Sequence, residues 1–376
     1  MPASSHAPSY GQKITSCSYI FSTPTVQGVT IKTRGYAALT AGSQLEPFEF
    51  ERRELGAKDV ALTISFAGIC HSDIHQVAEE WGPALFPMVP GHEIAGYVSA
   101  VGSEVTKFKV GDAIGVGVFI DSCRKCSSCL QGLQQYCLEG MTGTYNGLER
   151  DGKTVAMGGY SNLFVVNEDY AVTIPKNLPL DGVAPLLCAG ITLYSPIKNW
   201  NIGPGMQVAV MGLGGLGHMG VKFAAAMGAE VTVLSHSPNK KDDALSMGAD
   251  HFVSTKDPAN LAPLEKKFDL ILNTVSAELV IDDYLKLLKL DGTLVVIGLP
   301  GKPYAVHAGT LLNGRRRIAG SMIGGVAQLQ EMLNFCGENN IVSDVEVIKA
   351  DYINQAYVRT VASDVKYRFV IDASTF

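Results

Sequence analysis

Two groups of residues in this chain carry side chains that bind metals and move protons. The first runs from Gly68 to His75, with the sequence G-I-C-H-S-D-I-H, and continues at Pro90-Gly-His-Glu93. It brings one thiol, three imidazoles and several carboxylates into a short stretch of a chain in which only 18% of the residues are charged. This density of ligands and titratable groups predicts a site of metal binding or proton transfer.

The second group is a run of four cysteines with the spacing Cys123-x2-Cys126-x2-Cys129-x7-Cys137. Four thiolates in one short loop can complete a tetrahedral zinc shell, which leaves no open position for a substrate. We therefore predict a structural zinc lobe over residues 123–137. An iron–sulfur cluster is the alternative, but the Cys-Pro partner pattern of ferredoxins is absent and the fourth cysteine comes too late.

A catalytic zinc takes fewer protein ligands than a structural one, because substrate or water occupies the remaining position. Cys70 and His92 are candidate ligands in the first group, and a third ligand must come from elsewhere in the chain. Cys188, in the sequence P-L-L-C-A-G-I-T, is placed to reach a cleft between two domains. Each residue also has a structural alternative, as a packed core thiol or a hydrogen-bonded imidazole.

A glycine-rich loop follows the apolar strand predicted at residues 207–211 and opens a helix predicted at 216–227. In this context G-x-G-x-x-G predicts a dinucleotide site. The first glycine allows the turn, the second allows a pyrophosphate to approach the helix N-terminus, and the third allows close packing. A plain strand–helix turn without ligand is the alternative. The loop consists of Gly212, Leu213, Gly214, Gly215, Leu216 and Gly217.

The residues after the next strand indicate which cofactor binds. NAD sites usually offer a carboxylate there for the ribose 2′-hydroxyl. This chain has none in Ser235-His-Ser-Pro-Asn-Lys-Lys241, and offers hydroxyls, an imidazole and lysines instead. A 2′-phosphate needs donors and positive charge, so the pattern favours NADP(H). Alternatively, the lysines only begin a solvated helix. The candidate contacts are Ser235, His236, Ser237 and Lys240.

Two kinds of domain must position these groups. Residues 33–178 contain short strands separated by glycine turns, which predicts a β-rich, barrel-like domain. Residues 179–325 alternate apolar strands with helices, including a helix expected at 279–289, which predicts a parallel sheet covered on both faces. Residues 326–376 hold a helix at 326–339 and a closing strand. The predicted fold class is α/β.

Composition excludes several classes of protein. The 376 residues carry a net charge of −6, which disfavours a nucleic-acid partner. No apolar run reaches the ~18–20 residues of a membrane span. The crowded cysteines indicate a reducing compartment, and we expect a cytoplasmic protein. Residues 1–32 form a predicted N-terminal extension that lacks Asp and Glu, so an organelle-targeting segment is an alternative.

Several motifs occur in an order that resembles one family. They are G-I-C-H-S-D at 68–73, P-G-H-E-I at 90–94, the four-cysteine run, C-A-G-I-T at 188–192, G-L-G-G-L-G-H-M-G at 212–220, G-S-M-I-G at 320–324 and V-K-Y-R-F-V-I-D at 365–372. Together they resemble the zinc-dependent medium-chain dehydrogenase/reductases, and within them the cinnamyl-alcohol-dehydrogenase-like aldehyde reductases. The resemblance spans about residues 33–376. It implies a GroES-like catalytic domain that is interrupted by a Rossmann domain and resumes at the end of the chain.

The resemblance also implies roles for the metal-site residues. Cys70, His92 and Cys188 would hold a catalytic zinc, and Glu93 would enter its shell in the absence of substrate. Asp73 would orient His92, as carboxylates beside ligating imidazoles do.

Further roles follow from the same resemblance. Ser72 would touch the substrate oxygen, where the related plant enzymes more often have Thr, and pass a proton that a cofactor ribose hydroxyl and His75 resupply. Thr192, Ser321 and Arg368 match positions that contact the cofactor.

The implied reaction is hydride transfer between NADPH and aromatic or medium-chain aldehydes or primary alcohols, in a homodimer joined through an edge of the Rossmann sheet. Three alternatives stay open from the sequence. They are a zinc enzyme for polyols, a reductase for iminium or enone substrates, and a non-catalytic NADPH-binding protein.

Overall fold

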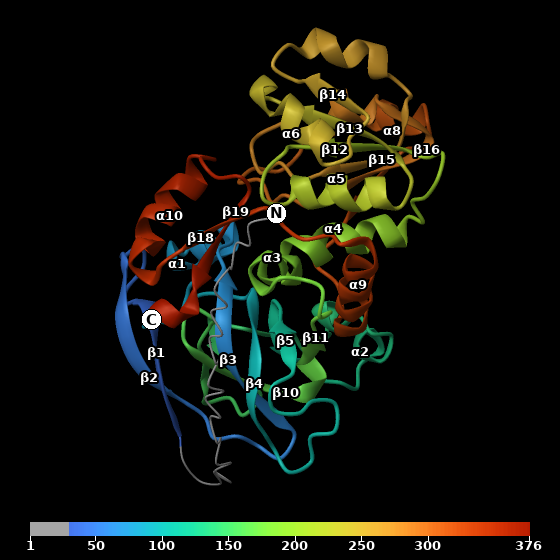
Figure 1. Ribbon diagram of the computed structural model, residues 1–376. Helices are drawn as coiled ribbons and strands as arrows, with labels where there is room; N and C mark the ends of the chain where they lie inside the picture. Colours follow the sequence, from blue (N-terminus) through green and yellow to red (C-terminus); the bar gives the residue numbers. More distant parts are fainter. Residues whose placement is uncertain (1–29) are drawn as a thin grey trace, which may run out of the picture.

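Two β-sheets of different construction organise the chain into two lobes (Figure 1). The computed structural model describes residues 30–376. Strand β1 begins at Ile31, so the predicted extension of residues 1–32 lies almost entirely outside the described residues.

The first sheet has seven strands in the order β11-β5-β4-β3-β19-β18, and β10 also pairs with β3. All of its pairings are antiparallel except that of β18 with β19. Its strands are β3 (Asp59–Gly68), β4 (Ile94–Val101), β5 (Ala113–Val116), β10 (Leu163–Asn167), β11 (Ala171–Thr173), β18 (Val345–Ile348) and β19 (Arg368–Asp372). β3 is largely buried because β4 pairs along one edge while β10 and β19 share the other.

Smaller elements complete this lobe. Two-stranded ribbons are formed by β1 (Ile31–Ala38) with β2 (Leu45–Arg52), β6 (Phe119–Asp121) with β7 (Thr142–Gly143), and β8 (Gly147–Leu148) with β9 (Val155–Ala156). Its short helices include α1 (His71–Val77), α2 (Ser127–Leu130), η1 (Gln134–Tyr136) and η2 (Glu168–Tyr170).

The second sheet has six parallel strands in the order β14-β13-β12-β15-β16-β17. They are β12 (Gln207–Met211), β13 (Glu230–Ser235), β14 (His251–Ser254), β15 (Phe268–Asn273), β16 (Leu288–Val296) and β17 (Arg317–Gly320). The central strand β12 is apolar on both faces, and Val208, Ala209 and Val210 are fully buried. Because the chain leaves β12 toward β13 and later resumes on its other side with β15, the carboxyl end of β12 is the topological switch point.

Helices cover the parallel sheet and join it to the first lobe (Figure 1). They are α3 (Leu180–Val183), η3 (Ala184–Leu187), α4 (Ala189–Asn199), α5 (Gly217–Ala226), η4 (Pro238–Lys240), α6 (Lys241–Ser246), η5 (Pro258–Leu264), α7 (Ile281–Leu285) and α8 (Ala308–Leu312).

After the second sheet the chain returns to the first lobe. The returning segment contains α9 (Val326–Asn339), η6 (Ala350–Tyr352), α10 (Ile353–Val361) and η7 (Ala373–Thr375). Its strand β19 pairs with β3, which comes from the start of the chain. The predicted α/β class, with a β-rich domain and a doubly wound parallel sheet, is confirmed. The domain limits at 178/179 and 325/326 stay predictions.

Some expected elements differ from the observed ones. The helix expected at 279–289 is wrong at its end, because α7 stops at Leu285 and β16 begins at Leu288. Leu287 and Leu288 are almost fully buried, and the Leu287 carbonyl accepts from the Phe268 amide at 3.0 Å. This apolar pair therefore packs beside β15 in the sheet and does not extend the helix. Helix α9 has the limits expected for 326–339.

Within residues 30–376, no helix is by itself long and apolar enough to cross a membrane. One helix pair, Leu180–Leu187 with Ala189–Asn199, passes the same test only when joined across a bend of 57°.

Candidate active site and metal sites

The predicted ligands of the catalytic metal come together from three separate segments. Cys70 is the N-cap of α1, His92 and Glu93 immediately precede β4, and Cys188 is the N-cap of α4. One ligand atom from each lies within 4.8 Å of all the others, and all four residues are buried. The His92 Nε2 atom is 3.3 Å from the Cys188 Sγ atom.

Asp73 determines which nitrogen of His92 faces this cluster. Its Oδ1 atom lies 3.0 Å from His92 Nδ1, which leaves Nε2 directed at Cys188. Burial opposes a charged imidazole, but Asp73 and Cys70 together outweigh it and raise the pKa of His92 well above its usual value. This is the arrangement of carboxylate, imidazole and metal that fixes the tautomer of a ligating histidine.

The donor set fits a zinc ion. Zinc prefers thiolate and imidazole ligands at about 2.3 Å and 2.0–2.1 Å, so ligand atoms around one ion lie within about 4 Å of each other. Glu93 adds a second sign of fit, because its Oε2 atom is buried and has no hydrogen-bond partner among residues 30–376. A buried carboxylate oxygen without a partner is costly, and a cation beside it would remove that cost.

The pKa values of the Cys70 and Cys188 thiols are shifted in opposite directions. A hydrogen bond from Cys188 lowers the pKa of the Cys70 thiol well below its usual value, and the same contact raises the pKa of Cys188 well above it. Since thiolates are the metal-binding form of cysteine, this pair is prepared to bind a cation.

Arg368 links the ligand cluster to the nucleotide loop. Its guanidinium donates to Glu93 Oε1 at 2.5 Å and to the Ile69 carbonyl at 2.8 Å. Its side chain also packs on Gly215, where an added Cβ would lie 2.8 Å from Arg368 Cδ. The metal ligands and the predicted cofactor loop are therefore neighbours.

Ser72 and His75, the predicted proton carriers, lie three residues apart on α1 and so share one face of the helix. Ser72 Oγ is 3.5 Å from Cys70 Sγ, which places it beside the ligand cluster. His75 is half-buried, contacts Glu80 through Nδ1 and stacks on Trp81 with ring centroids 4.8 Å apart. The pair thus extends from the ligand cluster toward solvent.

The glycine loop has the geometry that a pyrophosphate site needs. Gly212 has φ +84, and a Cβ at Gly217 would lie 2.0 Å from the Gly212 carbonyl, so protein packing requires glycine at both positions. A Cβ at Gly214, in contrast, would meet no protein atom within 4 Å. Glycine at this second position suits the close approach of a ligand to the backbone at the start of α5.

The residues expected to recognise the 2′-phosphate follow β13 directly. Ser235 is buried and its Oγ accepts from the Ser237 amide at 3.3 Å, while His236 is exposed. The Lys240 ammonium donates to the Leu213 carbonyl at 2.8 Å. The end of β13 and the glycine loop therefore lie together, with a positive charge between them.

Thr192 and Ser321, two further candidates for contact with the cofactor, lie in different parts of the fold. Thr192 lies in α4, where its hydroxyl donates to the Cys188 carbonyl at 2.6 Å. Ser321 directly follows β17, and its amide donates to the Val296 carbonyl at 3.2 Å. Ser321 thus lies at the carboxyl edge of the parallel sheet, which also carries the glycine loop.

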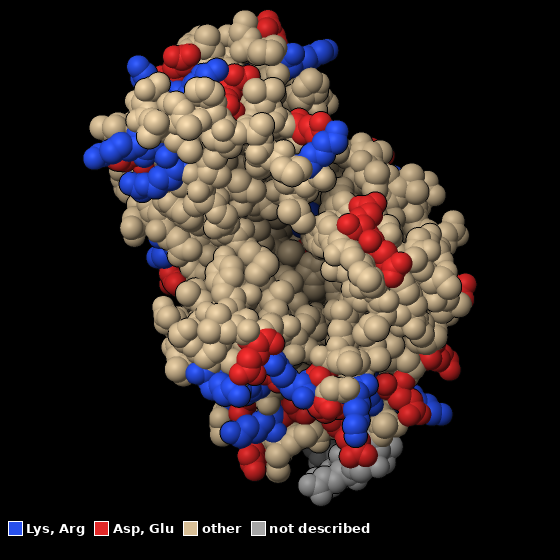
Figure 2. All heavy atoms as spheres, turned by 180° about the vertical axis from the view of Figure 1, so that it is seen from behind, with Lys and Arg blue, Asp and Glu red and all other residues tan. Residues whose placement is uncertain are grey.

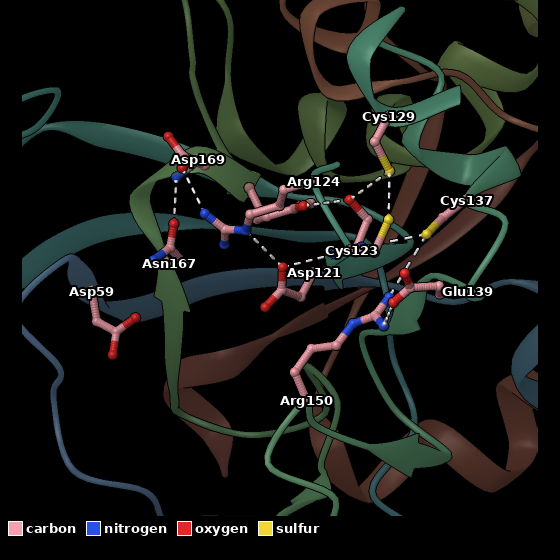
Figure 3. A network of polar contacts seen from close by, with 12 residues as sticks. Asp59, Asp121, Cys123, Arg124, Cys129, Cys137, Glu139, Arg150, Asn167 and Asp169 are labelled. Carbon is pink, nitrogen blue, oxygen red and sulfur yellow. Dashed lines mark hydrogen bonds and ion pairs between the residues drawn. The ribbon is translucent and has the colours of Figure 1, made fainter. Parts of the chain in front are cut away.

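The four cysteines of the predicted structural lobe also converge, with their sulfur atoms within 4.8 Å of one another. Figure 3 shows three of them, Cys123, Cys129 and Cys137. Cys123 and Cys129 Sγ atoms are 3.8 Å apart, too far for a disulfide. Amides of Cys129 and Leu138 lower the pKa of Cys126 to about 6, which favours the thiolate. The set fits a closed zinc shell.

Arg124 anchors this lobe to its surroundings (Figure 3). Its guanidinium donates to Asp121 at 3.0 Å and to Asp169 at 2.8 Å.

Sequence reasoning missed a tyrosine beside the site. Tyr160, which lies in none of the sequence motifs described above, donates its hydroxyl to Asp73 Oδ2 at 2.9 Å. Tyr145, stacked on His92 with centroids 5.8 Å apart, was also missed. The one local sign was Gly158-Gly159 before Tyr160, since glycine pairs allow close backbone approach.

A dinucleotide-binding sheet joined to a β-rich domain, with a buried Cys–His–Cys set beside the cofactor loop, defines the class of zinc-dependent dehydrogenases. Figure 2 shows a hollow between the lobes whose visible walls are almost free of charged residues. Residues 56–176 match the alcohol dehydrogenase GroES-like domain, and residues 215–338 match the zinc-binding dehydrogenase family.

Individual relatives cover nearly the whole chain. NADP-dependent alcohol dehydrogenase C 1 of Mycolicibacterium smegmatis is 58% identical over 341 residues, which are 90% of this chain and 97% of the relative. The aldehyde reductase YahK of Escherichia coli is 49% identical over 348 residues, covering 92% and 99%. The structure of the cinnamyl alcohol dehydrogenase SbCAD4 from Sorghum bicolor superposes with a TM-score of 0.89 at 46% identity, covering 92% and 98%. The chain belongs to the zinc-dependent alcohol dehydrogenase family, which confirms the resemblance seen in its motifs.

Proposed function

We propose that this protein is a zinc-dependent, NADP(H)-dependent alcohol dehydrogenase that interconverts aldehydes and primary alcohols. The observation that carries the proposal is the buried Cys70–His92–Cys188 set, joined through Glu93 and Arg368 to the glycine loop. The relatives support it. The Mycolicibacterium protein is named an NADP-dependent alcohol dehydrogenase, and the protein CAD from Helicobacter pylori, 42% identical, has a crystal structure complexed with NADP(H).

The chain's residues divide the work of the reaction. Cys70, His92 and Cys188 would hold a zinc ion, which would supply Lewis acidity toward a carbonyl oxygen, and the glycine loop would hold NADPH, the source of hydride. Ser72, beside Cys70, is positioned to give a proton to the product oxygen. Glu80 holds His75 through Nδ1, so His75 Nε2 remains available to exchange the proton with solvent.

Apolar surroundings favour aromatic or medium-chain substrates. Ile323 lies with Val118, Leu187 and Ile191 around a small apolar recess. Leu187 directly precedes the ligand Cys188. Apolar walls of this kind exclude water and bind a substrate mainly through its hydrocarbon part.

A panel of aldehydes tests the function. We expect NADPH absorbance to fall with benzaldehyde, cinnamaldehyde and hexanal, because apolar side chains such as Leu187 lie beside the ligand Cys188. Polyols with NADP⁺, and cyclic imines or enones with NADPH, serve as the alternatives. Turnover confined to these alternatives, or none with any substrate for zinc-loaded protein, would contradict the proposal.

Lys240 provides a test of cofactor choice. Lys240→Ala should weaken NADPH binding about 10- to 100-fold, since a charge-assisted hydrogen bond contributes roughly 1.5–3 kcal/mol, and should weaken NADH binding much less. Fluorescence titration with both cofactors measures the difference. The matched control is Lys222→Ala, another half-buried lysine that donates to a carbonyl, that of Val342 at 2.9 Å. Equal loss for both cofactors would show that Lys240 acts only on the loop.

We further propose a cytoplasmic homodimer. Strand β17 is the edge of the six-stranded sheet, and Ile318 on it and Leu312 before it are exposed by 36% and 78%. Pairing of two β17 strands would continue the sheet and cover these residues. Light scattering should then give about twice the 40.0 kDa of one chain. Free thiols at every cysteine among residues 30–376 support a reducing compartment.

A further inference from the structure

The carboxylate of Asp73 is the meeting point of the two segments that carry metal ligands. It is fully buried and accepts four hydrogen bonds. Oδ1 contacts His92 Nδ1 at 3.0 Å and the Gly91 amide at 3.1 Å. Oδ2 accepts from the Cys70 amide at 3.0 Å and from the Tyr160 hydroxyl at 2.9 Å.

Tyr160 is the one donor in this set that comes from neither ligand segment. It is fully buried, and its own amide donates to the Pro90 carbonyl at 2.9 Å. Its ring lies against Gly91, where an added Cβ would be 2.5 Å from Tyr160 Cδ1 and where the backbone φ is +103. Backbone contacts thus fix the position of the Tyr160 ring independently of the hydrogen bond from its hydroxyl to Asp73.

We propose that Tyr160 is a positioning residue for the catalytic metal site, acting through Asp73 on both Cys70 and His92, an inference that rests on the proposed function. Without the hydroxyl, Oδ2 would keep only the Cys70 amide, and the carboxylate would be free to rotate about its Cβ–Cγ bond. Rotation would loosen the orientation of the His92 ring and of the first turn of α1 together. Such supporting contacts of metal ligands typically account for about 10- to 100-fold in metal affinity.

Tyr160→Phe tests the proposal because it removes one oxygen and keeps the ring on Gly91. The full-length protein is stripped of metal, and the zinc affinity of the catalytic site is measured by competition with a chromophoric chelator. The visible spectrum after loading with Co²⁺ reports the ligand geometry. We expect affinity to fall about 10- to 100-fold with a shifted Co²⁺ absorption band, while zinc at the four-cysteine lobe is retained.

The control is Tyr194→Phe, which removes the hydroxyl of a similarly buried tyrosine; that hydroxyl donates to Glu331 at 3.0 Å, away from the metal ligands. Unchanged zinc affinity in Tyr160→Phe, or an equal loss in Tyr194→Phe, would overturn the proposal. So would failure of Tyr160→Phe alone to fold, since the hydroxyl would then support the fold as a whole.

A double-mutant cycle with Asp73→Asn adds an independent measurement. If Tyr160 acts through Asp73, removing its hydroxyl in the Asp73→Asn background should have little further effect on zinc affinity. Additive losses would contradict that route. Zinc affinity is measured without turnover, so it tests the role of Tyr160 separately from the proposed function. If the protein without substitutions binds both zinc ions but reduces no aldehyde, that result contradicts only the proposed function.

Discussion

Replacing Cys70 by serine should reduce aldehyde turnover about 1,000-fold while leaving NADPH binding nearly unchanged. Loss of a Lewis acid removes several kcal/mol of transition-state stabilisation, and each 1.36 kcal/mol is a factor of ten in rate. Serine is not among the usual zinc ligands, so the site would lose one of its three strong donors. Serine is also a favoured N-cap, so α1, which begins after Cys70, should persist.

Three measurements separate this result from a general loss of structure. Zinc content should fall by the ion of the Cys70 cluster and keep that of the four-cysteine lobe, NADPH fluorescence should titrate normally, and the unfolding temperature should change little. The control is Cys336→Ser, in which a fully buried thiol of α9 outside both clusters receives the same substitution. Turnover of Cys70→Ser equal to that of unchanged protein would refute the metal assignment.

Local sequence patterns predict a structural feature correctly when a single segment of the chain forms the whole feature. The four cysteines lie within a single loop, so their spacing alone indicates a closed metal shell. The glycine loop follows a strand and opens a helix, and the observed β12 and α5 surround it as expected. Helix α9 has a clear amphipathic period, and its limits were predicted from 326 to 339.

Features assembled from distant segments were only partly predictable. The Arg368–Glu93 contact joins residues 275 positions apart, and the Tyr160–Asp73 contact spans 87. No periodicity or spacing encodes such pairs, because they depend on how β19 and the segment before β10 pack in three dimensions. Cys188 was assigned from the motif around it and from the resemblance, and only the fold explains how it reaches His92.

The helix expected at 279–289 is wrong at its end because the same residues are compatible with a helix and with a strand. The run after Leu279 contains leucines at helical spacing, yet the ladder beside β15 takes up Leu288 and the following residues as strand β16. A short apolar run is compatible with both structures, and tertiary pairing decides between them.

The second large effect is expected at Gly214, where substitution should strongly weaken cofactor binding without disturbing the fold. In Gly214→Val the added Cβ would meet no described residue within 4 Å apart from its chain neighbours, so stability should be close to normal. The side chain would instead occupy the space above the N-terminus of α5, where a pyrophosphate must approach. Losing two hydrogen bonds to a charged group, at roughly 1.5–3 kcal/mol each, weakens NADPH binding by about 100-fold or more.

Gly217→Ala should instead reduce the stability of the fold. Its Cβ would lie 2.0 Å from the Gly212 carbonyl, so strand and helix must separate and the unfolding temperature should fall clearly. Thermal unfolding and NADPH titration of both variants distinguish a glycine needed by a ligand from one needed by packing. Normal NADPH affinity in Gly214→Val would place the pyrophosphate elsewhere, and a loss of stability equal to that of Gly217→Ala would show that Gly214 serves the fold.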